Sequence, residues 1–156
     1  MTEYIPSGGE NGLAALATAP NEPATGRPLA PLLLVIDDDS MVGRFITHAA
    51  EECGFRTSRT TSAEAFSRSL REHRPDAVAV DLCVPGSDGI EIIRLLAEEK
   101  YRGSVIIISG LNRRILDAAL RLGEALGLSM APPLAKPFRF DELADRLERA
   151  APGVAQ

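Results

Sequence analysis

The organisation of this chain follows from the stretch Ala77-Val78-Ala79-Val80-Asp81, which leads into the loop Leu82-Cys83-Val84-Pro85-Gly86-Ser87-Asp88-Gly89. An apolar run that stops at a carboxylate and passes into a loop with proline and glycine is typical of a buried strand. Such a strand brings its acid to the open edge of a sheet. Asp81 is therefore the first candidate for chemistry.

Further strands and helices are predicted on both sides of this stretch. The strands are expected at residues 32–36, 55–60, 105–109 and 129–134. The strand at 55–60 is more polar and so expected nearer an edge, while Pro132 and Pro133 interrupt the last one. Apolar residues at helical spacing predict helices that begin near Ser40, Ser62, Ile90, Leu111 and Asp141, with the two serines as N-caps. This alternation predicts an α/β protein whose parallel sheet has helices on both faces.

One folded domain is expected within the 156 residues. Residues 1–30 are rich in Gly, Pro, Ala, Asn and Thr without a sustained apolar period, so they are predicted to form a flexible N-terminal tail. The domain is predicted to cover residues 31–150, and residues 151–156 to form a C-terminal tail.

Composition and charge argue against several classes of function. The longest apolar runs fall far short of the roughly 20 residues that span a bilayer, and the N-terminus does not resemble a secretory signal. A cytoplasmic protein without a membrane partner is therefore expected. The formal net charge of −5 leaves no basic field for a phosphate backbone, so no nucleic-acid partner is expected. Cys53 and Cys83 lack metal-ligand spacing and are expected to be structural or incidental thiols.

Five polar side chains are predicted to meet at one edge of the sheet. Because ligands of an open parallel sheet bind beyond the carboxyl ends of its strands, the residues at those ends are the candidates. They are Asp37, Asp38, Asp81, Ser109 and Lys136.

The chemistry of this set points to phosphoryl transfer. Three neighbouring carboxylates repel one another and favour a hard divalent cation such as Mg²⁺. With that charge neutralised, one carboxylate can attack phosphorus and form an aspartyl phosphate. Lys136 would supply a positive charge to the phosphoryl group, and the Ser109 hydroxyl would donate to one of its oxygens.

This ordered set resembles the receiver domains of two-component response regulators. The resemblance covers residues 32–150 and is carried by Asp37-Asp38 after the first strand, Asp81 with Pro85, Asp88 and Gly89 behind it, Ser109, and Lys136-Pro137-Phe138. It implies a flavodoxin-like (βα)5 doubly wound fold with the strand order 2-1-3-4-5.

The resemblance also implies roles for the site residues. Asp81 would accept a phosphoryl group from a histidine kinase or a phosphotransfer protein. The side chains of Asp37, Asp38 and Asp81 and the main-chain carbonyl of Cys83 would hold Mg²⁺. Ser109 would move toward the phosphoryl group to report it, and Lys136 would precede a cis peptide bond. A stand-alone signalling protein that acts through protein contacts, and not an enzyme, is expected.

The sequence departs from the family pattern at Pro133. Receivers commonly carry an aromatic residue three positions before the lysine, and a proline cannot swing as that ring does. An interaction module that works without phosphorylation is therefore one alternative. A haloacid-dehalogenase-like phosphatase is another, because Asp37 and Asp39 have the Asp-x-Asp spacing of that family's nucleophile motif. Asp39 is otherwise expected to cap the following helix.

Overall fold

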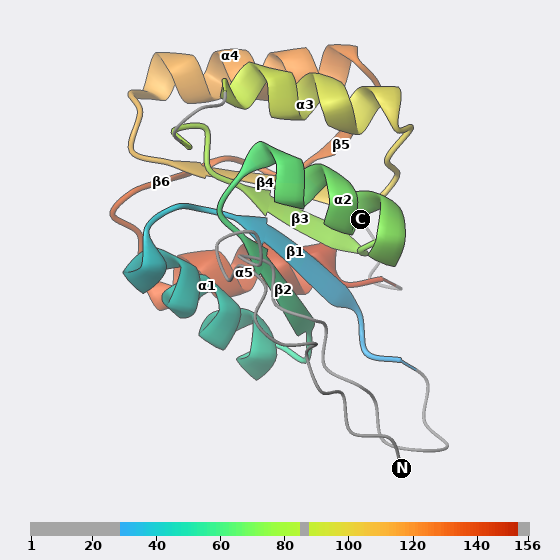
Figure 1. Cartoon of the computed structure of the whole chain (residues 1–156). Helices are drawn as coiled ribbons and strands as arrows, with labels where there is room; N and C mark the ends of the chain where they lie inside the picture. The colour runs from blue at the N-terminus through green and yellow to red at the C-terminus, as the bar shows by residue number, and fades with distance from the viewer. Residues whose placement is uncertain (1–28, 85–87, 153–156) are drawn as a thin grey trace, which may run out of the picture.

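Strands and helices alternate along the chain in the computed structural model, which describes residues 29–84 and 88–152 (Figure 1). Nearly all of the predicted N-terminal tail, most of the predicted C-terminal tail, and Pro85 lie outside these residues. The strands are β1 (Leu32–Ile36), β2 (Arg56–Thr60), β3 (Ala77–Val80), β4 (Ser104–Ser109), β5 (Ser129–Met130) and β6 (Leu134–Ala135). The helices are α1 (Ser40–Glu52), α2 (Ala63–His73), α3 (Gly89–Glu98), α4 (Arg113–Ala125) and α5 (Phe140–Ala150).

All of these strands run parallel in one sheet with the order β2-β1-β3-β4-β5, and β6 also pairs with β4. The predicted α/β fold and its 2-1-3-4-5 order are confirmed. The polar strand β2 lies at one edge of the sheet, as its composition indicated.

Two apolar cores lie on the two faces of the sheet. Alternate residues of a strand point to opposite faces, so Leu34 and Ile36 of β1 enter one core while Leu33 and Val35 enter the other. Buried residues of α2, α3 and α4 belong to the first core, and buried residues of α1 and α5 belong to the second. Figure 1 shows the two layers of helices above and below the sheet. The prediction of helices on both faces is confirmed.

The expected fifth strand is divided in two by the prolines. Val105 pairs with Met130, an offset of 25 residues, while Ile108 pairs with Leu134, an offset of 26. One extra residue is therefore accommodated as a bulge between β5 and β6. Pro132 and Pro133 have no backbone N–H to give to β4, whereas Ala131 and Lys136 on either side still donate to Val105 and Ser109.

Of the two serines predicted to cap helices, one does so and the other does not. Ser62 caps α2 as predicted, since its side chain accepts from the Ala65 N–H. Ser40, however, is the first residue of α1, so its prediction as N-cap is wrong. Asp39 takes that position, because its carboxylate accepts the N–H groups of Met41 and Val42. The capping role expected for Asp39 is confirmed.

Gly89, at the start of α3, allows the helix to approach the backbone that follows β3. A Cβ atom there would lie 2.7 Å from both the Cα and a side-chain carbon of Leu82. Gly89→Ala is therefore expected to lower the free energy of unfolding by about 1–3 kcal/mol, because a backbone atom must shift. Urea unfolding measures this.

Gly110→Ala is the matched control for that variant. A Cβ atom at Gly110 would meet nothing within 4 Å, so a change within about 0.5 kcal/mol is expected. Equal destabilisation by the two substitutions would contradict the close approach at Gly89.

Among the helices of the described ranges, none combines the length and apolar character needed to cross a bilayer.

Candidate functional site

The carboxyl ends of the central strands carry the polar residues that were predicted to converge. Asp37 follows β1, Asp81 follows β3, Ser109 is the last residue of β4, and Lys136 follows β6. The parallel order of these strands brings their ends to one edge. The structure thus assembles residues that lie 99 positions apart in the chain.

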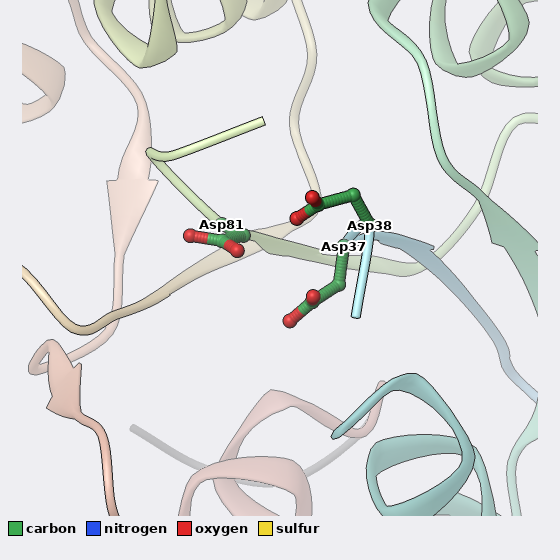
Figure 2. Close-up of side chains that lie close together, drawn as sticks. All are labelled: Asp37, Asp38 and Asp81. Atoms are coloured by element: carbon green, nitrogen blue, oxygen red, sulfur yellow. The ribbon is translucent and has the colours of Figure 1, made fainter. Parts of the chain in front are cut away.

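Three carboxylates form the acidic part of the site (Figure 2). Asp37, Asp38 and Asp81 each offer an oxygen atom, and these atoms all lie within 4.8 Å of one another. Asp37 and Asp81 are buried, with exposed fractions of 1% and 4%, whereas Asp38 faces solvent. Hard oxygen donors clustered at this distance, with one side open, suit a cation such as Mg²⁺ that keeps part of its water shell.

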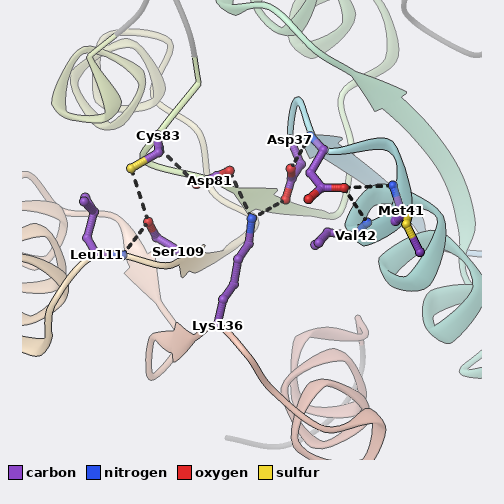
Figure 3. A network of polar contacts seen from close by, with 9 residues as sticks. Asp37, Met41, Val42, Asp81, Cys83, Ser109, Leu111 and Lys136 are labelled. Carbon is purple, nitrogen blue, oxygen red and sulfur yellow. Dashed lines mark hydrogen bonds and ion pairs between the residues drawn. The ribbon is translucent and has the colours of Figure 1, made fainter.

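Lys136 supplies the positive charge that offsets two of these acids. Its Nζ atom lies 3.0 Å from Oδ2 of Asp37 and 3.2 Å from Oδ2 of Asp81 (Figure 3). Burial by itself would lower the pKa of Lys136, but its hydrogen bonds and ion pairs with Asp37 and Asp81 raise that pKa above the ordinary value. The ammonium is therefore fully charged at neutral pH. The Lys136–Pro137 peptide bond is cis, as the family resemblance implied.

Asp37 is held in place by its own loop. Its Oδ1 accepts the Asp39 N–H at 2.8 Å while its Oδ2 accepts from Lys136. Burial raises the pKa of the Asp37 carboxyl and is the largest influence on it, outweighing the lowering by the Asp39 N–H and by Lys136. The neighbouring charge of Asp81 adds to the rise. In the absence of a metal ion, the ionised form of Asp37 therefore destabilises the folded state.

Asp37→Asn is expected to be more stable than the wild type at neutral pH, by about 1 kcal/mol, in buffer without divalent ions, because the buried charge is removed while Lys136 keeps its ion pair with Asp81. Because the pKa of Asp37 is higher in the folded than in the unfolded chain, the wild type loses stability as the pH rises from about 3.9, the ordinary value, through the folded-state pKa. Asparagine has no proton to lose there. The stability difference should therefore be small near pH 3 and grow toward pH 7, as urea unfolding at several pH values would measure.

Asp39→Asn is the control for that experiment. Asp39 is exposed, and asparagine caps a helix about as well as aspartate. A stability gain in Asp37→Asn that did not change with pH, or an equal gain in Asp39→Asn, would contradict the assigned cost of burying the Asp37 charge.

Ser109 and Cys83 form a second polar pair beside Asp81 (Figure 3). The Ser109 hydroxyl is fully buried, donates to Sγ of Cys83 at 3.8 Å, and accepts the Leu111 N–H at 3.3 Å. The Cys83 N–H in turn donates to Oδ1 of Asp81 at 2.9 Å. The family resemblance implied a role only for the main-chain carbonyl of Cys83. No sequence pattern indicated the thiol contact, because Cys83 lies in the loop after β3 and Ser109 ends β4.

An open apolar pocket adjoins the charged site. It has a volume of about 410 Å³ and is lined by Met41, Val42, Phe45, Lys136, Pro137 and Phe138. The ring of Phe45 packs edge-on against Phe138, with 5.7 Å between centroids, and Met41 is 79% exposed. Lys136 is shared by the pocket and the acidic cluster.

Asp39 and Pro133, the residues that suggested the two alternative functions, lie outside the acidic cluster. Asp39 turns its carboxylate to the start of α1, so the Asp37 and Asp39 pair does not form a joint site. Pro133 lies in the bulge between β5 and β6, where the carbonyl of the preceding Pro132 accepts from the Arg146 guanidinium at 3.0 Å.

Comparison with known proteins identifies one family. The family model of the response regulator receiver domain matches residues 33–148. The transcriptional regulatory protein QseB of Escherichia coli O157:H7 is 34% identical over 116 residues, which are 74% of this chain and 51% of that protein. The regulatory protein VirG of Agrobacterium fabrum is 34% identical over 134 residues, which are 84% of this chain and 51% of that protein.

Solved structures agree with the sequence matches. The receiver domain of the Francisella response regulator 1452 superimposes with a TM-score of 0.65 at 28% identity, over 75% of this chain and 93% of that one. This chain spans about half the length of the curated relatives that it matches.

Proposed function

This chain belongs to the response regulator receiver domain family, a family of signalling modules, and on that premise we propose that it accepts a phosphoryl group on Asp81. The observation that carries the proposal is the position of Asp81. Its carboxylate ends a central strand, lies 3.2 Å from the Lys136 ammonium, and is one of three acids whose oxygen atoms gather within 4.8 Å. A nucleophile, a cation and a candidate metal site thus occupy one edge of the sheet.

In the proposed reaction an oxygen atom of Asp81 attacks the phosphorus atom of the donor. A new O–P bond forms while the bond from phosphorus to the donor breaks, and the electron pair of that bond leaves with the donor group. Lys136 stabilises the charge on the phosphoryl oxygens, since its ammonium already lies beside Asp81. The Ser109 hydroxyl turns to donate to one of these oxygens and so reports the modification.

The acidic cluster fits the Mg²⁺ ion that such a reaction uses. Asp37, Asp38 and Asp81 would hold it together with the main-chain carbonyl of Cys83, and hard carboxylate oxygens are suitable donors. When bound, the ion neutralises negative charge on the acids and on the phosphoryl group. The chain itself positions the nucleophile, the ammonium and the hydroxyl.

The phosphoryl donor is proposed to be a histidine kinase or a histidine phosphotransfer protein. A protein donor must bring its phosphohistidine to Asp81 and therefore covers the surface around the site. The apolar pocket of Met41, Phe45 and Phe138 adjoins Lys136 and offers that donor an apolar contact.

Residues 31–150 are proposed to act as one receiver unit in the cytoplasm. The start of the unit is tied to the sheet, because Arg56 donates from its backbone N–H to the Pro31 carbonyl and from its guanidinium to the Ala30 carbonyl. The net charge of −5 favours a protein rather than a nucleic acid as the target of this chain. The relative QseB is a transcriptional regulatory protein. Identifying the proteins that bind this chain would test whether it also acts in transcriptional regulation.

The experiment is chemical mapping of the modified residue. The protein is incubated with Mg²⁺ and acetyl phosphate, the acyl phosphate is reduced with borohydride, and the product is identified by peptide mass spectrometry. One modified residue, Asp81, is expected. Modification of Asp37 together with sustained hydrolysis of phosphomonoesters would contradict the proposal and favour a phosphatase.

A further inference from the structure

Cys83 contacts both the proposed phosphoacceptor and the proposed reporter of its modification. Its backbone N–H donates to Asp81, and its thiol accepts the hydroxyl proton of Ser109 (Figure 3). The side chain is exposed, so filling the core does not require a residue of this size here. The thiol contact therefore needs another explanation.

The Ser109 hydroxyl has only one proton to donate. In this structure the proton goes to Sγ of Cys83, while the oxygen accepts the Leu111 N–H. Donation to an oxygen of a phosphoryl group on Asp81 requires the same proton. The thiol and the phosphoryl group are therefore competing acceptors for one buried hydroxyl.

We propose that the Cys83 thiol is a latch, a positioning residue that holds the Ser109 hydroxyl in its resting orientation and so opposes its capture by a phosphoryl group. This inference rests on the proposed phosphorylation of Asp81. Sulfur is a weak acceptor, and the 3.8 Å contact is long. The latch is therefore weak enough to be released by the charged oxygen atoms of a phosphoryl group, which are much better acceptors.

Beryllofluoride with Mg²⁺ is the probe for this latch, because it binds a carboxylate as a tetrahedral stand-in for a phosphoryl group. Its affinity is measured by calorimetry in the full chain, in Cys83→Ala, in Ser109→Ala and in the double variant. Cys83→Ala keeps the backbone N–H and carbonyl, so the contacts to Asp81 and the candidate metal ligand are retained. It is expected to bind beryllofluoride about two- to fivefold more tightly, the range of a weak hydrogen bond.

The double variant distinguishes a latch from a structural effect. With Ser109→Ala in place there is no hydroxyl to hold, so adding Cys83→Ala is expected to change the affinity by less than about 1.5-fold. Cys53→Ala is the matched control, since that thiol lies at the end of α1 in the other core, and it is expected to bind as the wild type does. Without the probe, the free energy of unfolding should fall in Cys83→Ala by about the free energy gained in binding, since both report the lost hydrogen bond. It should not change when Cys83→Ala is added to Ser109→Ala.

Two outcomes overturn the latch by itself. They are wild-type affinity in Cys83→Ala, and an equal gain in affinity with and without the Ser109 hydroxyl. Failure of the wild type to bind beryllofluoride at all would contradict the proposed function, and the latch with it.

Discussion

Asp81→Asn is expected to take up no phosphoryl group from acetyl phosphate in Mg²⁺, a fall of at least about 10³-fold in the rate of modification. Asparagine keeps the shape of the side chain and an oxygen that can accept the Cys83 N–H, so the loop after β3 retains its hydrogen bond. The amide, however, is a poor nucleophile. The two other acids of the cluster are not expected to substitute for it, because both follow β1, whereas the proposed acceptor follows the neighbouring strand β3.

Intact-protein mass spectrometry after a timed incubation measures this result. Asp39→Asn serves as the control, because it removes a neighbouring carboxylate that lies outside the cluster and caps α1. It is expected to be modified as the wild type is. Equal modification of Asp81→Asn and the wild type would show that Asp81 is not the acceptor.

The alternative of a phosphorylation-independent module makes a different prediction for the same variant. If partners captured from the native cell bound equally to the phosphorylated wild type, the unmodified wild type and Asp81→Asn, signalling would not depend on the modification. We expect instead that the phosphorylated wild type captures different partners from the unmodified wild type and from Asp81→Asn.

Lys136→Met is expected to change two measurable properties in opposite directions. The rate of modification by acetyl phosphate should fall by about 10²- to 10³-fold, because an ammonium that stabilises the developing charge is lost. Mg²⁺ affinity should rise, by about tenfold, because Lys136 pairs with Asp37 and Asp81 and its charge opposes a cation in the same cluster. Methionine keeps most of the length of the side chain and its apolar stem.

Calorimetric titration with Mg²⁺ and a timed acetyl phosphate reaction separate the two effects. The chain's other lysine, Lys100, lies between α3 and β4, near the amino end of β4 and so away from the site. Lys100→Met is therefore expected to change neither property. A parallel fall in metal affinity and rate in Lys136→Met would indicate that Lys136 organises the cluster and does not compete with the cation.

Much of this fold could be predicted from the sequence because its parallel strands are buried on both faces. Such strands appear as short, wholly apolar runs, and those at 32–36 and 105–109 differ little from β1 and β4. The polar residues that follow each run then lie at one edge by topology alone. This is why Asp37, Asp81, Ser109 and Lys136 could be grouped from the order of the strands and the residues that end them.

The details that sequence reasoning missed depend on which of several suitable groups makes a contact. Ser40 and Asp39 both have capping side chains, and only the backbone path after β1 decides in favour of Asp39. The division of the last strand into β5 and β6 depends on the register with β4, which two prolines shift by one residue. The contact between Cys83 and Ser109 joins the loop after β3 to the end of β4 without any sequence periodicity, so no pattern predicts it.

The prolines between β5 and β6 also affect how this protein behaves at high concentration. A free sheet margin offers its N–H and C=O groups to any extended chain, and that is the usual starting point of aggregation. Here the margin consists of two very short strands separated by Pro132 and Pro133, neither of which has an N–H to donate. Another molecule therefore finds only two short, interrupted runs of backbone on which to add a strand at this side of the sheet. An assembly formed there is expected to depend on side-chain contacts more than on added backbone hydrogen bonds.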